Sequence, residues 1–276
     1  MNGMKNAPRL TDRTALMRNR ARAAPAPVRF LHETALEELQ FRLGMVNRTF
    51  TAPAIVAGDT DFWGEHWPDA RLVHDEEVLA LDEGAHDLVI HAMCLHWAND
   101  PVGQLIQCRR ALKPDGLLLA VLCGGETLHE LRSVITSAEV QATGGLSPRV
   151  LPMGDIRDLG ALLQRSGLAL PVADNLTLRA SYSDAFHLMR ELRAMGEANA
   201  LADRLRHPTR RSVLRDAAEL YAATHGEENG RIPATYELMF LTGWAPDESQ
   251  PKPLRPGSAT KSLADALGGV ETPLPD

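Results

Sequence analysis

The sequence has little cysteine, and its cysteines and histidines form no metal-ligand motif. Cys94, Cys108 and Cys123 include no CxxC pair and lie in apolar or helical stretches. This spacing argues against a disulfide framework and against a cysteine zinc site. No two histidines have the i, i+4 spacing of a zinc-binding helix. We therefore predict buried reduced thiols, no metal site and a cytoplasmic compartment.

Long apolar runs and an excess of positive charge are also absent. No apolar run reaches the ~18 residues that a membrane-spanning helix needs, so no membrane span is expected. The formal net charge of -7 argues against a general nucleic-acid binder, because such proteins are usually basic.

Positive charge is concentrated at the start of the chain, where residues 1–29 hold seven Lys and Arg residues and one acid, Asp12. An Arg-rich, acid-poor start is typical of an organelle transit peptide. This start lacks serine enrichment, however, and it equally suits a basic helix over residues 11–22 that serves a partner or the domain's own acidic face. It has no apolar segment of a secretory signal. We predict a basic helix or arm over residues 1–30.

The middle of the chain alternates strand and helix patterns. Apolar runs at 53–57, 87–92 and 117–122 are typical of buried parallel strands. Helix signals fall between and after them, with Asp100 before Pro101 as a start and Gly144 as a stop. The expected helices cover 101–112 and 126–142, and residues 113–116 are expected to turn. This rhythm predicts right-handed crossovers, a parallel sheet and an α/β fold.

The predicted domain covers residues 31–245 and begins with an amphipathic helix at 31–46. Its second half is expected to contain strands and helices at 155–166, 176–181, 183–198, 209–224 and 234–244. The helices between the last two strands form an insertion at about 183–225. The Pro- and Gly-rich tail, 246–276, is expected to be a surface or mobile segment.

The position of a ligand site follows from the sheet, because open α/β sheets bind ligands beyond the carboxyl ends of their strands. The candidate loops follow residues 57, 74, 92 and 122. A nucleotide-binding loop needs several glycines to bring its backbone close to the ligand. The first loop offers only Gly58, and the bulky Phe62 and Trp63 follow it. A tight turn into a short helix is the simpler interpretation.

Several motifs together resemble the class I S-adenosylmethionine methyltransferases. They are Asp-Leu-Val-Ile at 87–90, Leu-His-Trp at 95–97, Leu-Lys-Pro-Asp-Gly at 112–116 and Gly-Gly-Glu-Thr-Leu at 124–128. More narrowly, the chain resembles the group that contains the malonyl carrier-protein methyltransferases and a mitochondrial complex I assembly factor. The segments that resemble the assembly factor lie at 127–132, 144–148, 195–199, 233–236, 243–244 and 248–250.

The resemblance implies a Rossmann-like methyltransferase fold, a mainly parallel sheet with a C-terminal antiparallel strand, and S-adenosyl-L-methionine as cofactor. It places His96 and Trp97 at the reacting end of the cofactor, with His96 as a base. A packing Trp97 beside a solvent-facing His96 is the alternative. The implied cofactor-binding residues are Gly58, Asp59, Asp75, Glu76 and Leu95, and the implied substrate-binding residues are Glu126, Tyr236 and Trp244.

The chain departs from this family near its first strand. Family members have an acidic, multi-glycine loop there, followed by a second strand whose final acid binds the ribose. Here only about thirteen residues separate Gly58 from Arg71, so one strand–helix unit is expected to be missing. Residues 71–77 correspond either to the family's third strand or to its second strand. In the second case, Asp75 or Glu76 would bind the ribose. Losing the ribose contact, at about 1.5–3 kcal/mol per charged hydrogen bond, would weaken cofactor binding about a hundredfold.

The resemblance therefore implies three functions. The first is a methyltransferase-family enzyme with a degenerate cofactor loop and a role in complex I assembly, where the resemblance implies hydroxylation of an arginine. The second is a non-catalytic assembly factor that binds a protein partner such as a complex I subunit. The third is a carrier-protein methyltransferase whose acyl carrier protein docks on clusters of basic residues, such as the arginines within residues 204–211. A eukaryotic source would place the protein in the mitochondrial matrix.

Overall fold

The computed structural model describes residues 9–251. Residues up to Pro246 belong to one compact unit, and residues 247–251 belong to a second. The described part of the second unit contains a tight turn, in which the Ser249 backbone N–H donates to the Asp247 carboxylate. No helix among residues 9–251 is long and apolar enough to cross a membrane. The expected tail therefore lies mostly outside the described residues.

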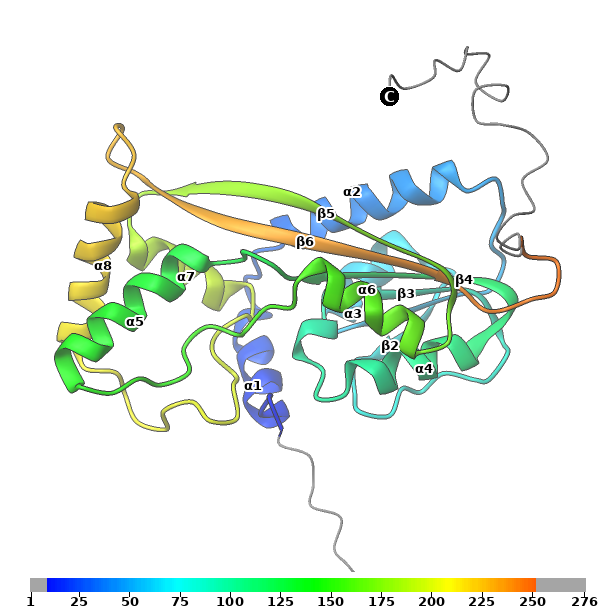
Figure 1. Cartoon of the computed structure of the whole chain (residues 1–276), viewed down its shortest axis with the longest axis horizontal. Coiled ribbons are helices and arrows are strands. Elements are labelled where there is room, and N and C mark those ends of the chain that lie inside the picture. The colour runs from blue at the N-terminus through cyan, green and yellow to red at the C-terminus, as the bar shows by residue number, and fades with distance from the viewer. Residues whose placement is uncertain (1–8, 252–276) are drawn as a thin grey trace, which may run out of the picture. The chain divides into compact units, whose positions relative to one another are not determined.

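The six strands form one mixed sheet (Figure 1). Its order is β2-β1-β3-β4-β6-β5, with β1 to β4 parallel and both β6 and β5 antiparallel to their neighbours. This confirms the predicted α/β methyltransferase fold with its antiparallel C-terminal strand. The strands are β1 (Pro53–Ala57), β2 (Arg71–His74), β3 (His86–Ala92), β4 (Leu112–Cys123), β5 (Ala169–Tyr182) and β6 (Ile232–Trp244).

The edge strand β2 pairs directly with β1. In the usual doubly wound order, 3-2-1-4-5-6, that place belongs to the second strand. No strand lies outside β2 in the described part of the chain, so the outermost unit is the one that is missing. Of the two alternatives for residues 71–77, this position supports the second strand, with Asp75 immediately after it.

Most helices begin where an aspartate side chain accepts a backbone N–H of the first turn. Asp12, Asp59, Asp100, Asp155 and Asp184 all cap helices in this way. The helices are α1 (Arg13–Ala23), α2 (Phe30–Met45), α3 (Thr60–His66), α4 (Pro101–Ala111), α5 (His129–Thr143), α6 (Ile156–Arg165), α7 (Ala185–Ala194) and α8 (Arg211–His225), with a 3-10 turn, η1 (Leu95–Trp97).

Three predicted boundaries were wrong, and backbone geometry explains two of them. The helix expected from residue 126 begins at His129, because Gly125 and Leu128 both have positive φ angles, 50° and 55°. The helix expected over 183–198 ends at Ala194, shortly before Gly196 with its φ of 80°. The third, β5, is longer than the predicted 176–181, because it pairs with β6 from Ala169 to Tyr182, with a register shift between Ala169 and Val172. The turn predicted over residues 113–116 was also wrong, because these residues belong to β4, where the pairing with β3 shifts register and Asp115 has a positive φ of 58°.

The sheet carries a hydrophobic core on each face, and β1 shows how the sequence divides between them. Ile55 and Ala57 join the larger cluster, whereas Ala54 and Val56 join the other. Helices α2, α3, α5, α7 and α8 contribute to the larger cluster, and α4 and α6 to the second. The three cysteines are buried and free, as expected.

Helix α1 belongs to the predicted basic arm, residues 1–30, and lies at the carboxyl ends of the strands. Its Leu16 packs with Trp97 and Leu201 in a third small cluster. The Asn19 side chain donates to the Ala198 carbonyl at 2.9 Å. These contacts join α1 to the segment that follows α7, so the two together cover the end of the sheet.

Acid is expected to loosen α1 before the sheet unfolds. The hydrogen bond from the Ala15 backbone, together with Arg206 and Arg204, lowers the pKa of Asp12 from 3.8 to about 2. Because its pKa is depressed by folding, this carboxylate stabilises the docked helix above its ordinary pKa, and the contribution is lost as pH falls toward 2. Hydrogen-exchange protection of α1 should therefore fall over this interval while that of β3 persists.

The matched variant Asp12→Asn carries no charge at any pH. Its α1 protection should already be reduced at neutral pH and should change less between pH 4 and pH 2. Equal acid responses in the two proteins would show that Asp12 does not hold α1 in place.

Candidate functional site

Two adjoining cavities lie at the carboxyl ends of the parallel strands. The loop cavity, of about 390 Å³, is lined by residues that follow β1, β2 and β3 and by α1. The helix pocket, of about 560 Å³, is lined by α5, α7 and the segment between α7 and α8. Met195 and Glu197 line both cavities. The site therefore lies at the edge of the sheet where topology predicts it.

Asp75, the expected ribose-binding acid, is buried and bound by two arginines of α1. Arg20 donates to both carboxylate oxygens at 2.8 and 2.9 Å. Arg13 donates to one of these oxygens at 3.1 Å and to the Asp75 carbonyl at 2.5 Å. Burial alone would favour the neutral acid, but Arg20 and Arg13 hold the pKa of Asp75 below its ordinary value. Asp75 is therefore an ionised member of an internal ion-pair cluster.

The loop after β1 is engaged by arginines as well. A Cβ atom built on Gly58 would collide with the guanidinium of Arg20, so Arg20 packs directly against the glycine backbone. Asp59 caps α3 and forms a two-pronged ion pair with Arg29, at 2.8 and 3.2 Å. The acid and the glycine that sequence reasoning assigned to the cofactor therefore both contact N-terminal arginines.

The residues of the loop cavity, as they lie here, do not fit S-adenosylmethionine. Both carboxylate oxygens of Asp75 already accept hydrogen bonds, and the close-approach surface of Gly58 is covered. A ribose at Asp75 would have to displace two charged donors, whose hydrogen bonds contribute about 1.5–3 kcal/mol each. Of the five cofactor candidates, only Gly58 and Asp59 line the cavity itself. Asp75 is buried beneath its two arginines, Glu76 has an exposed side chain, and Leu95 is buried in the second core cluster.

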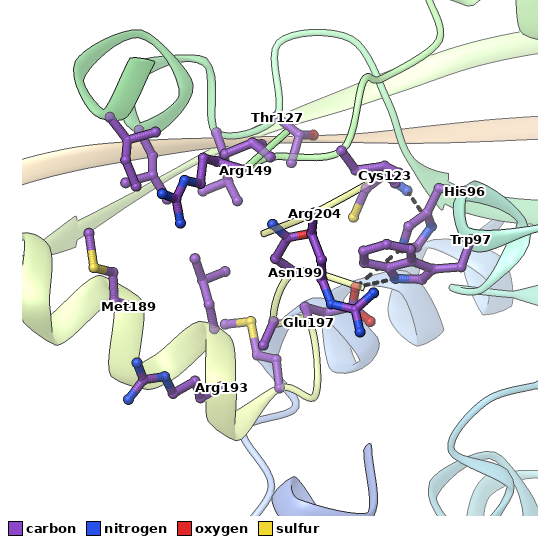
Figure 2. Close-up of a pocket in the computed structure, with 18 of the residues that line it drawn as sticks. His96, Trp97, Cys123, Thr127, Arg149, Met189, Arg193, Glu197, Asn199 and Arg204 are labelled. Carbon is purple, nitrogen blue, oxygen red and sulfur yellow. Dashed lines mark hydrogen bonds and ion pairs between the residues drawn. The ribbon is translucent and has the colours of Figure 1, made fainter. Parts of the chain in front are cut away.

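His96, Trp97 and Glu197 form a polar group in the lining of the helix pocket (Figure 2), and Glu197 also lines the loop cavity. The Trp97 indole N–H donates to the Glu197 carboxylate at 2.5 Å, and His96 Nε2 lies 3.5 Å from the same oxygen. The Cys123 backbone N–H donates to His96 Nδ1 at 3.4 Å, which turns Nε2 toward Glu197. Both aromatic side chains are buried, so His96 is not the solvent-facing residue of the alternative interpretation.

Glu197 is the acid of this group. Burial favours its neutral form, but the neighbouring His96, together with Arg20 and Trp97, holds the pKa of Glu197 below its ordinary value. Its side chain is 24% exposed, and it borders both cavities. An ionised carboxylate in this position is suited to receive a cationic or hydrogen-bond-donating group of a ligand.

The helix pocket is apolar along its walls and basic at its rim. Two of its arginines are neutralised from outside the pocket, Arg149 by Glu139 and Arg204 by Asp12. The Arg204 side chain is largely buried in this ion pair. The wall residues are Leu31, Leu128, Leu131, Ile135, Leu151, Met153, Met189 and Leu192.

Of the three substrate-binding candidates, the structure brings one to the pocket. Tyr236 lines it, with its hydroxyl 3.0 Å from that of Tyr182. Glu126 has an exposed side chain outside the pocket lining. Trp244 is the last residue of β6 and pairs with Leu117 in the middle of β4, away from Cys123 at the carboxyl end, and Arg48 lies over its ring. Its place in the strand therefore removes it from the site.

Sequence reasoning missed four residues of this site. Glu197 lies within the segment 195–199, which attracted notice only as part of the family resemblance. Arg13 and Arg20 are seven residues apart, which puts them on one helix face two turns apart, and that spacing was available as a signal. No local sequence pattern indicates that Arg29 contacts Asp59, because that contact depends on how α2 packs against the rest of the domain.

Comparisons with known proteins agree with this fold. Residues 49–120 match the family described as methyltransferase domain. The chain is 37% identical over 198 residues to arginine-hydroxylase NDUFAF5, mitochondrial, of Danio rerio, covering 72% of this chain and 61% of that protein. It is 38% identical over 210 residues to the Homo sapiens protein of the same name, covering 75% and 60%.

A second group of relatives carries a different name. A malonyl-acyl-carrier-protein O-methyltransferase of Methylovorus sp. (strain MP688) is 31% identical over 208 residues, covering 75% of this chain and 66% of that protein. The YcgJ protein of Bacillus subtilis superimposes with a TM-score of 0.48 at 12% identity, over 76% of this chain and 99% of that chain. The family assignment rests on the sequence relatives.

The chain spans about 60% of the length of the arginine-hydroxylases that it matches. It has the α/β methyltransferase sheet with antiparallel C-terminal strands, and its cavities lie at the carboxyl ends of the parallel strands. With its sequence relatives in two groups of the same family, the chain belongs to the class I S-adenosylmethionine methyltransferases.

Proposed function

We propose that this chain is a partner-binding member of the family that works without S-adenosylmethionine. The observation that carries the proposal is the ion-pair cluster in which Arg13 and Arg20 occupy Asp75. These two guanidinium groups satisfy the acid that would otherwise hold the ribose, and Arg20 also covers Gly58. The protein's own N-terminal helix thus lines the loop cavity and engages Gly58 and Asp75.

The ligand proposed for the helix pocket is an arginine side chain of a protein partner. Glu197 supplies an ionised, partly exposed carboxylate at the inner end of that pocket. Guanidinium groups form strong paired hydrogen bonds with carboxylates. The relatives named arginine-hydroxylase support an arginine as the group recognised, and a subunit of respiratory complex I is the partner that we propose.

A second candidate function is catalysis at the same place. His96 lies 3.5 Å from Glu197 in the lining of the helix pocket, and a histidine paired with a carboxylate is a common general base. This arrangement favours an enzyme only if a cofactor displaces Arg20 from Gly58. Cofactor binding therefore separates the two candidates.

Calorimetric titration with S-adenosylhomocysteine tests the proposal. We expect no saturable heat from the full chain at ligand concentrations up to about 1 mM, because binding would break the Asp75 cluster. The matched control is the Methylovorus carrier-protein methyltransferase under the same conditions. Saturable binding by this chain with a micromolar Kd would contradict the proposal and favour the enzyme.

Replacement of Glu197 tests the arginine site. The Glu197→Gln variant keeps the shape of the side chain but loses its charge. Its affinity for an arginine-containing peptide should fall about tenfold to a hundredfold, as expected for loss of a charged hydrogen bond. Fluorescence anisotropy of a labelled peptide measures this change.

The control variant, Glu126→Gln, alters an exposed acid that does not line the helix pocket. Its affinity for the same peptide should equal that of the unchanged protein. If both variants bind the peptide as tightly as the unchanged protein does, Glu197 is not the arginine site.

A further inference from the structure

The rim of the helix pocket carries positive charge that nothing else in the described structure uses. The pocket is lined by four arginines and His207, with Glu197 as its one acid. Arg149 and Arg204 have acidic partners, whereas Arg22 and Arg193 take part in no ion pair among residues 9–251. Both of these side chains belong to exposed residues. The rim is therefore cationic on a chain whose net charge is -7.

The two unpaired arginines come from different elements. Arg22 belongs to the last turn of α1, and Arg193 to the last turn of α7. Met189, one turn before Arg193 on α7, also lines the pocket, so this helix presents a methionine and a cation to the same space. Figure 2 shows both side chains on α7, across the pocket from His96 and Trp97. Any ligand that enters the pocket must pass a cationic rim.

Between rim and acid the lining is apolar. Leu131, Ile135 and Leu192 are buried in the larger core cluster and also line the pocket. The pocket thus has three chemical zones: cations outside, apolar walls, and the Glu197 carboxylate beside His96. A single arginine side chain reaches only the apolar walls and the Glu197 carboxylate, and it leaves the rim cations without an acidic partner. An extended peptide with acidic, apolar and basic side chains fits all three.

We infer that the partner presents an arginine flanked by apolar residues and then by acidic residues, with the acids paired to Arg22 and Arg193. This inference rests on the proposed function for the arginine itself and adds the sequence around it. The acidic residues select the partner and steer it to the pocket, since charges at a rim act mainly on association and specificity. Their contribution is expected to weaken as salt rises.

Three labelled nonapeptides test this inference by fluorescence anisotropy with the full chain. All have leucine and alanine around a central residue. The first has a central arginine and a glutamate at each end, the second replaces both glutamates by glutamine, and the third replaces the arginine by citrulline. We expect the second to bind about threefold to tenfold more weakly than the first at low salt, in line with exposed ion pairs.

The double variant Arg22→Gln/Arg193→Gln should bind the first two peptides equally. The matched control, Arg110→Gln, changes an exposed arginine of α4 outside the pocket and should keep the difference. Equal binding of the first two peptides to the unchanged protein would overturn the inference while leaving the arginine site intact. Equal binding of the first and third would instead refute the proposed function, and binding by none of the three would refute both.

Discussion

The ion-pair cluster around Asp75 connects the parts of this structure that matter for function. It joins the end of β2 to α1 through Arg13 and Arg20, and Arg20 in turn covers Gly58 after β1. A buried carboxylate without such partners would be costly, because its charge would be removed from water without compensation. The cluster therefore both anchors the N-terminal helix and fills the place where the family's cofactor chemistry is organised.

The arginines of α1 engage Asp75 and Gly58 beside the loop cavity, whereas the helix pocket keeps the Glu197 carboxylate partly exposed. Glu197 borders both spaces, since it follows α7 and reaches His96 and Trp97 on η1. The segment after α7 is held by α1 through Asn19 and the Ala198 carbonyl. Helix α1 therefore contributes both to the position of Glu197 in the helix pocket and to the ion pairs at Asp75.

Local patterns were enough to predict the sheet and most helices, because apolar strands and aspartate caps act over a few residues. They also pointed to the carboxyl ends of the strands, where the two cavities lie, and to His96, which lines the helix pocket. Residue counting suggested the missing unit but left the identity of β2 open, which only its pairing with β1 resolves. The Asp75 contacts join residues 55 and 62 positions apart, and Glu197 lies 100 positions from Trp97, so no local pattern reveals them. Trp244 was misplaced because its aromatic character says nothing about which end of β6 it occupies.

A crystal structure of the full chain grown with millimolar S-adenosylhomocysteine tests the central claim most directly. The account predicts electron density for Arg20 against Gly58 and for both arginines on Asp75, with no nucleoside in the loop cavity. A ribose bound to Asp75, with Arg20 displaced from Gly58, would contradict it and would restore the protein to the cofactor-dependent members of its family.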